Sequence, residues 1–168
     1  RPPPRSTLFP YTTLFRSRKS RQRAIQVLFL WDVRKLPVED SIEAFYESLY
    51  SSENEEETGE ESESPPARDA FMETLARGTA GAVAELDSYI SQRAENWRLE
   101  RMPVVDRNIL RMAVYEMKEV GTPPAVVIDE ALELARRFTE VEAIPFLNGV
   151  LDAVRKLVIP GSATGSAS

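Results

Sequence analysis

Two stretches near the end of the chain, 126–138 and 145–158, restrict the possible fold more than any other feature. In the first, apolar residues recur at i, i+4, i+7, i+8 and i+11, and the second carries a similar stripe. This spacing is typical of one buried face of an amphipathic helix, and Pro145 suits a first helical turn. The sequence therefore predicts two amphipathic helices joined by a short corner. Their apolar positions are Val127, Ala131, Leu134, Ala135 and Phe138, then Leu147, Val150, Leu151, Val154 and Val158.

Helical spacing recurs along much of the remaining chain, and no stretch alternates convincingly in the manner of a β-strand. Asp40 or Ser41 suits the cap of one of these helices, and Gly121 followed by two prolines is a typical helix end. The sequence therefore predicts an all-α fold of about six or seven helices. Besides the two described above, the predicted helices cover 18–35, a stretch from about 41 to 50, 68–97 and 105–120.

Glycines inside predicted helices indicate where other parts of the fold come close. A helical Gly costs about 1 kcal/mol relative to Ala, so its presence needs a reason. We expect the backbone of another helix close to Gly149. Gly78 and Gly81 in the long predicted helix indicate a close crossing or a small bend.

The residue types in the chain exclude the common catalytic sets. The chain has no cysteine and no histidine, and therefore no Ser-His-Asp or Cys-His site and no usual zinc ligand set. It also lacks a glycine-rich phosphate loop. Asp129, Glu130 and Glu133 share a predicted helix face with Arg136 and Arg137, as in a solvated face with ion pairs three or four residues apart. We therefore predict a binding module, with no enzymatic activity, metal or cofactor.

The net charge of −6 originates largely in one short segment. Seven glutamates lie within 53–63, and without them 20 acidic residues face 21 basic ones. A net acidic chain normally disfavours nucleic acid, but here the distribution of charge is more informative than its sum. Low hydrophobicity and dense like charge predict that 51–66 is a disordered insertion. No run of about 20 apolar residues is present to span a membrane.

The two ends of the chain are predicted to lie outside the folded domain. Residues 1–17 contain three early prolines and a near-repeat, Ser6–Phe9 and Thr12–Phe15, and resemble the translation of a sequencing adaptor. We expect this segment to be foreign and disordered, and not a signal peptide, because Pro10 and polar residues interrupt its apolar run. The small residues of 159–168 predict a disordered tail. The domain is thus predicted to span 18–158.

The first predicted helix begins with a cluster of cations. Positive charges at a helix start oppose the helix dipole, so their presence there needs a reason. One interpretation is a phosphate-binding patch, in which side-chain charge and helix N-terminal amides attract the same anion. The alternative is a solvated helix start without function. The cations are Arg18, Lys19, Arg21 and Arg23.

Several separated motifs resemble the NusB family of bacterial transcription antitermination factors. The C-terminal motifs are Ile128–Ala131, Leu134–Ala135 with Phe138, and Phe146–Asp152. Asp106–Glu116 is similar to the preceding helix of the family, and Arg21–Trp31 to its first helix. These motifs occur in the family's order and cover about 18–158. The resemblance implies the NusB fold, two small helical bundles packed together.

The resemblance also implies which residues bind RNA and which face a protein partner. The basic start of the first helix corresponds to the family's RNA-binding region. Phe29 and Phe146 could equally belong to the core, and Tyr115 could be purely structural. The expected RNA-binding residues are Arg18, Lys19, Arg21, Arg23, Gln26, Phe29, Glu142 and Phe146. The expected partner-binding residues are Asp106, Arg111, Tyr115 and Glu116.

The function implied by the resemblance is transcription antitermination in the cytoplasm. Such a factor pairs with the small-subunit ribosomal protein that doubles as NusE, binds single-stranded boxA RNA and joins an antitermination complex on RNA polymerase, chiefly at rRNA operons. Two alternatives stay open: a detached NusB-like domain of an rRNA cytosine methyltransferase, and a helical interaction scaffold without RNA. A further alternative gives the acidic insertion an autoinhibitory role over the basic patch.

Overall fold

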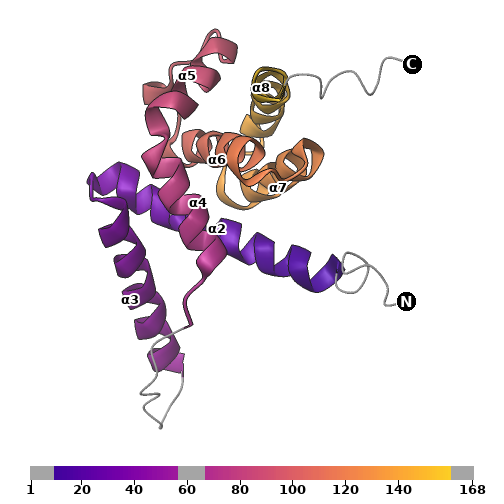
Figure 1. Cartoon of the computed structure of the whole chain (residues 1–168). Helices are drawn as coiled ribbons and strands as arrows, with labels where there is room; N and C mark the ends of the chain where they lie inside the picture. Colours follow the sequence, from indigo (N-terminus) through magenta and orange to yellow (C-terminus); the bar gives the residue numbers. More distant parts are fainter. Residues whose placement is uncertain (1–9, 57–66, 160–168) are drawn as a thin grey trace, which may run out of the picture.

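The computed structural model describes residues 10–56 and 67–159, and within these ranges every regular element is helical (Figure 1). The predicted all-α fold is confirmed. The α-helices are α2 (Pro10–Arg34), α3 (Val38–Glu56), α4 (Ala70–Gly81), α5 (Val83–Arg93), α6 (Val104–Tyr115), α7 (Pro124–Phe138) and α8 (Ala143–Val158). A short 3-10 turn, η1 (Leu99–Arg101), precedes α6, and a π-helical turn, η2 (Glu116–Val120), follows it.

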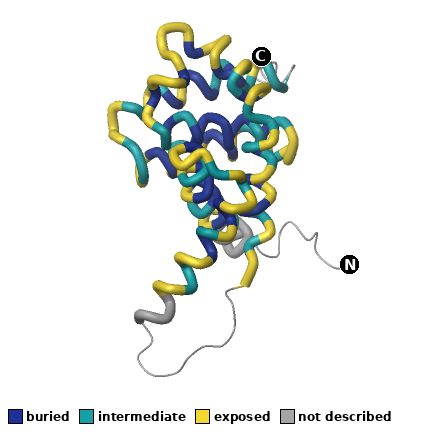
Figure 2. The backbone as a smooth tube through the Cα atoms, turned by 90° about the vertical axis from the view of Figure 1, so that its left-hand side faces the viewer, coloured by how far each residue is buried: buried dark blue, intermediate teal, exposed yellow. Residues whose placement is uncertain are grey.

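The helices form two groups that share α6 as their centre. Helices α2, α3 and α4 pack against one another, and α5, α7 and α8 pack around α6, which also contacts α2 and α4. In Figure 1, α3 extends from the first group away from α7 and α8. Figure 2 shows the buried residues concentrated in the middle of the molecule, where the two groups meet. The core is therefore continuous between them.

The two C-terminal helices confirm the pattern from which the fold was predicted. In α7, Val127, Ala131, Leu134 and Ala135 are buried, and in α8 the stripe from Leu147 to Val154 is buried as well. Helix α8 begins at Ala143, two residues before the predicted start. Glu140 and Val141 accept the backbone hydrogen bonds that form the corner between the helices.

Of the two glycines expected at close approaches, one prediction is confirmed and the other is wrong. A Cβ atom on Gly78 would lie 1.9 Å from Cζ of Tyr115, so α4 approaches α6 closely through this ring. A Cβ atom on Gly149 would meet nothing within 4 Å, because Gly149 lies on the exposed face of α8. The sequence shows which face of α8 is apolar, but it does not show whether anything contacts the opposite face, on which Gly149 lies.

Two predicted helix boundaries differ from the structure, and a third is confirmed. The long helix expected over 68–97 is broken between Gly81 and Val83, where Ala82 leaves the helical conformation. Helix α3 begins at Val38, so Asp40 and Ser41 lie within its first turn and do not cap it. The helix end predicted at Gly121 is confirmed, since this residue has a left-handed φ of 80°, which glycine adopts without strain.

Helical structure extends into two of the three segments predicted to be disordered. Helix α2 begins at Pro10, within 1–17, and α3 continues through Glu56, within 51–66. Residues 1–9, 57–66 and 160–168, on which the rest of those predictions falls, lie outside the described residues.

A buried polar network joins the two groups of helices. Asp32 on α2 accepts hydrogen bonds at 2.7 Å from Nε and Nη2 of Arg107 and at 3.0 Å from Nη1 of Arg111. Asn108 donates to the same carboxylate, and Arg111 also binds Asp87 on α5. Burial alone would raise the pKa of Asp32, but the two arginines and the amide outweigh it and lower the pKa to about 2. The contacts of Arg107 with Asp32 thus give it a structural role.

Candidate nucleic-acid interface

One face of α2 changes along its length from basic to aromatic. Arg18 and Lys19 are exposed, Gln26 is exposed two turns later, and Phe29 is 42% exposed. Gln26 lies seven residues after Lys19 and three before Phe29, and Arg18 lies eleven residues before Phe29, which places all four along one side of a helix. Ala24, Val27 and Leu28 occupy the opposite, fully buried side. The amphipathic pattern of α2 therefore fixes which side chains face solvent.

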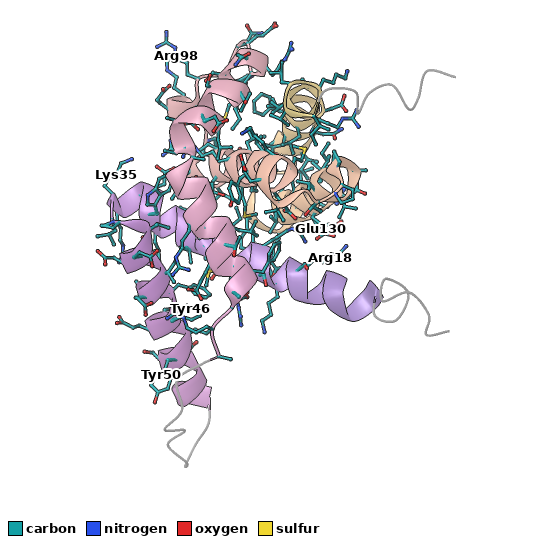
Figure 3. The ribbon with its side chains drawn as sticks, in the orientation of Figure 1. Arg18, Lys35, Tyr46, Tyr50, Arg98 and Glu130 are labelled. Carbon is teal, nitrogen blue, oxygen red and sulfur yellow. The ribbon has the colours of Figure 1, made fainter. Side chains whose placement is uncertain are left out.

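The four cations of the predicted patch differ in their surroundings. Lys19 is exposed. Arg18 is about half exposed, and its Nε donates to both carboxylate oxygens of Glu130 on α7 at 3.0 Å; Figure 3 shows the two side chains facing each other. The charge and hydrogen bonds of Glu130 raise the pKa of Arg18. Arg23 binds Asp69 at 3.2 Å and is mostly covered. Lys19 and Arg18 are thus the cations of the patch most accessible to RNA.

Arg21 lies in the interior, contrary to its predicted role on the surface. Its side chain is 5% exposed and forms a bidentate ion pair with Glu116, whose side chain is 1% exposed. Its guanidinium also lies 5.5 Å from the ring centre of Phe71 and 3.9 Å from Glu130. A charge that is buried and paired in this way joins α2 to α6 and is unavailable to a phosphate. This geometry argues for a structural role of Arg21.

The C-terminal end of α7 lies along the basic part of α2. A cavity of about 270 Å³ between the two helices is lined by Arg18 and Gln22 on one side and by Arg136 and Arg137 on the other. Arg136 binds Glu133 on its own helix, whereas the guanidinium of Arg137 lies 5.7 Å from the ring centre of Phe138. Sequence analysis treated Arg137 only as part of a solvated face. Its position beside α2 depends on the packing of α7, which no local signal reveals.

An apolar groove of about 350 Å³ continues this surface toward α3 and α6. Its walls come from four helices, which meet around Phe29 of α2 and Phe138 of α7. The groove thus places the exposed aromatic of α2 beside apolar side chains of α6 and α7 that are more than 70 residues away in the sequence. The other lining residues are Ile25, Gln26, Leu30, Phe45, Ser48 and Val105.

The remaining two RNA-binding candidates lie at the start of α8. Glu142 is exposed at the residue before the helix, and Phe146 is partly buried one turn later. The Phe146 ring lies 5.5 Å from the ring of Trp97, centre to centre, on the connector between α5 and α6. Phe146 therefore combines the two roles considered for it, packing against the core and contributing to the surface.

The four partner-binding candidates on α6 and its π turn do not form a free surface. Asp106, Arg111 and Glu116 are buried, and Tyr115 packs with its ring against Gly78. Burial raises the pKa of the Asp106 carboxyl. A partner could reach these side chains only by displacing the internal contacts of Arg111 and Glu116. Helix α6 packs against helices of both groups, which is why these side chains are largely covered.

The described residues contain no cluster of three metal-ligating side chains and no helix long and apolar enough to cross a membrane. The carboxylates of α7 are distributed between ion pairs: Glu130 binds Arg18, and Glu133 binds Arg136. The fold and the surface thus define a helical binding module with a basic and aromatic face.

Comparison with known proteins identifies the family of this module. The NusB family model matches residues 18–156, and the chain belongs to the NusB family. The transcription antitermination protein NusB of Solibacter usitatus (strain Ellin6076) is 57% identical over 139 residues, which cover 83% of this chain and 88% of the relative. That of Koribacter versatilis (strain Ellin345) is 41% identical over 140 residues, covering 83% and 88%. The family is one of non-enzymatic antitermination factors.

Solved structures agree with this assignment. NusB of T. maritima is 29% identical, with a TM-score of 0.69 over 89% of this chain and 96% of that one. A structure of the antitermination factors NusB and NusE in complex with dsRNA is 24% identical, with a TM-score of 0.67 over 85% and 98%. The second similarity shows the fold alone.

Proposed function

We propose that this protein is a cytoplasmic transcription antitermination factor that binds boxA-type single-stranded RNA together with a NusE-type ribosomal protein. In this role it joins the antitermination complex on RNA polymerase, mainly at rRNA operons. Family membership over residues 18–156 and the names of the curated relatives support the proposal. A structural neighbour that contains NusB, NusE and RNA supports the choice of partners.

The observation that carries the proposal is the exposed face of α2. Arg18 and Lys19 offer positive charge to RNA phosphates, and Gln26 offers an amide that can hydrogen-bond a base edge. Phe29 presents an aromatic ring on which an unpaired base can stack. A single helix thus presents, in order, the groups that bind the backbone and the bases of a single strand. The buried Arg21 and the largely covered Arg23 hold α2 in place.

The protein partner is expected at the apolar groove. Asp106, Arg111 and Glu116 are buried, whereas the neighbouring Val105 lines the groove and is only partly buried. An apolar recess with a polar rim is the type of surface on which protein partners bury their anchor residues. The partner and the RNA would then meet at Phe29, which would couple the two binding events.

Titration of a boxA-like single-stranded RNA over a salt series tests this proposal. If Arg18 and Lys19 each neutralise one phosphate, log K against log salt should have a slope of about −1.4, from about −0.7 for each contact. Lys19→Gln should reduce the magnitude of the slope by about 0.7. Lys35→Gln is the matched control, because Lys35 lies at the opposite end of α2 (Figure 3).

Addition of the NusE-type protein should tighten RNA binding by the native protein, and Phe29→Ala should weaken this coupling. Equal effects of Lys19→Gln and Lys35→Gln would contradict the assigned basic face. RNA affinity that does not depend on salt or on the partner would contradict the proposed function itself.

A further inference from the structure

We infer that Trp97 and Phe146 form a stacking site for an unpaired base of the bound RNA, on the connector between α5 and α6. The inference rests on the proposed function and extends its RNA-binding surface beyond α2 and the α7–α8 corner. It assigns a role to Trp97, for which sequence analysis predicted no function.

Trp97 is an exposed aromatic held in a fixed place. Its side chain is 56% exposed, and among the residues whose exposure the structure describes, Phe29 is the other large aromatic that is open to solvent. The backbone N–H of Trp97 donates to the carbonyl of Ala94 at 3.0 Å, which continues the end of α5. The tilted contact with Phe146, at 5.5 Å and 53°, supports one side of the indole. More than half of its surface stays available to a ligand.

The cavity beside Trp97 suits a nucleobase better than a bare phosphate. It measures about 630 Å³, within the ~300–1,000 Å³ range of small-ligand sites. Its charged side chains are two cations and two anions, which leaves no excess positive charge for a phosphate. The same groups, with the amide of an asparagine, present both hydrogen-bond donors and acceptors, as the edges of an unstacked base require. They are Glu95, Asn96, Arg98, Glu100 and Arg101.

The position of Trp97 is continuous with the candidate RNA interface. Arg137 at the end of α7 lines the cavity beside Arg18 of α2, and the corner from 139 to 142 leads directly into α8. Glu142 and Phe146, both expected to bind RNA, occupy the start of α8, and Phe146 contacts Trp97. A single strand that follows this corner from α2 would therefore arrive at Trp97. Arg98 extends outward beside Trp97 (Figure 3) and can bind the next phosphate of the strand.

Tryptophan fluorescence of the full chain tests the stacking directly. The chain contains two tryptophans, so Trp31→Phe leaves Trp97 as the only one. Titration with boxA-like RNA should quench its emission, and the same RNA with abasic residues should bind with little quenching. In the native background, Trp97→Leu should weaken RNA binding by about 5- to 100-fold, the loss of one stacked base. Trp97→Phe, which keeps an aromatic face, should retain most of the affinity.

Four outcomes would overturn the inference. Unchanged emission of Trp97 on saturation with RNA, together with native affinity of Trp97→Leu, would overturn it and leave the proposed function intact. A loss of affinity in Trp97→Leu that Trp97→Phe does not restore, with a lowered midpoint of urea unfolding, would assign Trp97 a structural role and also overturn it. If Trp97→Leu binds RNA normally but binds the NusE-type protein more weakly, the site takes a protein instead of a base. Absence of RNA binding by the native chain would reject the inference together with the function.

Discussion

Replacement of Arg21 by alanine tests whether this arginine stabilises the fold or binds RNA. In the structure, the guanidinium of Arg21 and the carboxylate of Glu116 are both buried and form a bidentate pair. Removal of one partner leaves the carboxylate of Glu116 buried without its principal counter-charge. Breaking a buried pair in this way typically lowers the free energy of unfolding by about 3–5 kcal/mol, far more than an exposed pair contributes.

The loss should be visible in both chemical and thermal unfolding. For a domain of this size, 1 kcal/mol corresponds to a change in Tm of about 2–4 °C, so Arg21→Ala should lower Tm by roughly 6–20 °C. Urea unfolding should show a lower midpoint with little change in slope, because the surface exposed on unfolding is nearly the same. Lys19→Ala is the control, since substitution of an exposed side chain without a buried partner usually changes stability by less than about 0.5 kcal/mol.

A double substitution tests the reasoning further. Arg21→Met combined with Glu116→Leu removes both charges and keeps apolar volume, and such replacements of buried pairs are often neutral or stabilising. We therefore expect the double variant to be more stable than Arg21→Ala. A loss below about 1 kcal/mol in Arg21→Ala, with a weakened affinity for RNA, would refute the buried-pair argument and return Arg21 to the RNA-binding set.

Two further predictions concern a close contact and a buried acid. Gly78→Ala should be less stable than Gly149→Ala by about 1–3 kcal/mol in urea unfolding, because a Cβ at 78 displaces the Tyr115 ring and one at 149 meets nothing; equal stabilities would contradict this. Asp32 has a folded pKa of about 2, below its unfolded value of about 3.9, so its contribution to stability is present above pH 4 and is lost as the pH falls toward 2. Asp32→Asn should be less stable than the native chain at pH 7 and should lose less stability between pH 4 and 2; parallel pH profiles of unfolding would contradict the assignment.

Sequence periodicity identified the helices well because it reflects a local property. In α7 and α8 the buried stripes coincide with those read from the spacing, since each helix needs one face turned to the core. Boundaries were predicted less well. The break at Ala82 and the start of α8 at Ala143 depend on how neighbouring helices pack, and this packing overrides local propensity.

The candidate site was predicted in part. The sequence placed Lys19, Arg18 and Phe29 on the first helix, and the structure exposes all three. It could not identify Arg137 or Trp97 as neighbours of that surface, because each reaches it from a distant segment. It also grouped Arg111 and Glu116 with the partner-binding residues, although both are buried where α6 and its π turn pack against the helical groups.

By itself the sequence determined the class of fold, the family and the presence of a basic stretch in the first helix, because these depend on residue type and on spacing within a few turns. Only the tertiary structure decided which of the cations remain available to RNA. Arg21 and Lys19 are two residues apart, yet Arg21 is paired with a glutamate 95 residues away and Lys19 is exposed. A helix turns by about 100° for each residue, so neighbouring cations point to different sides of α2, and the positions of α6 and α7 decide which of those sides is interior.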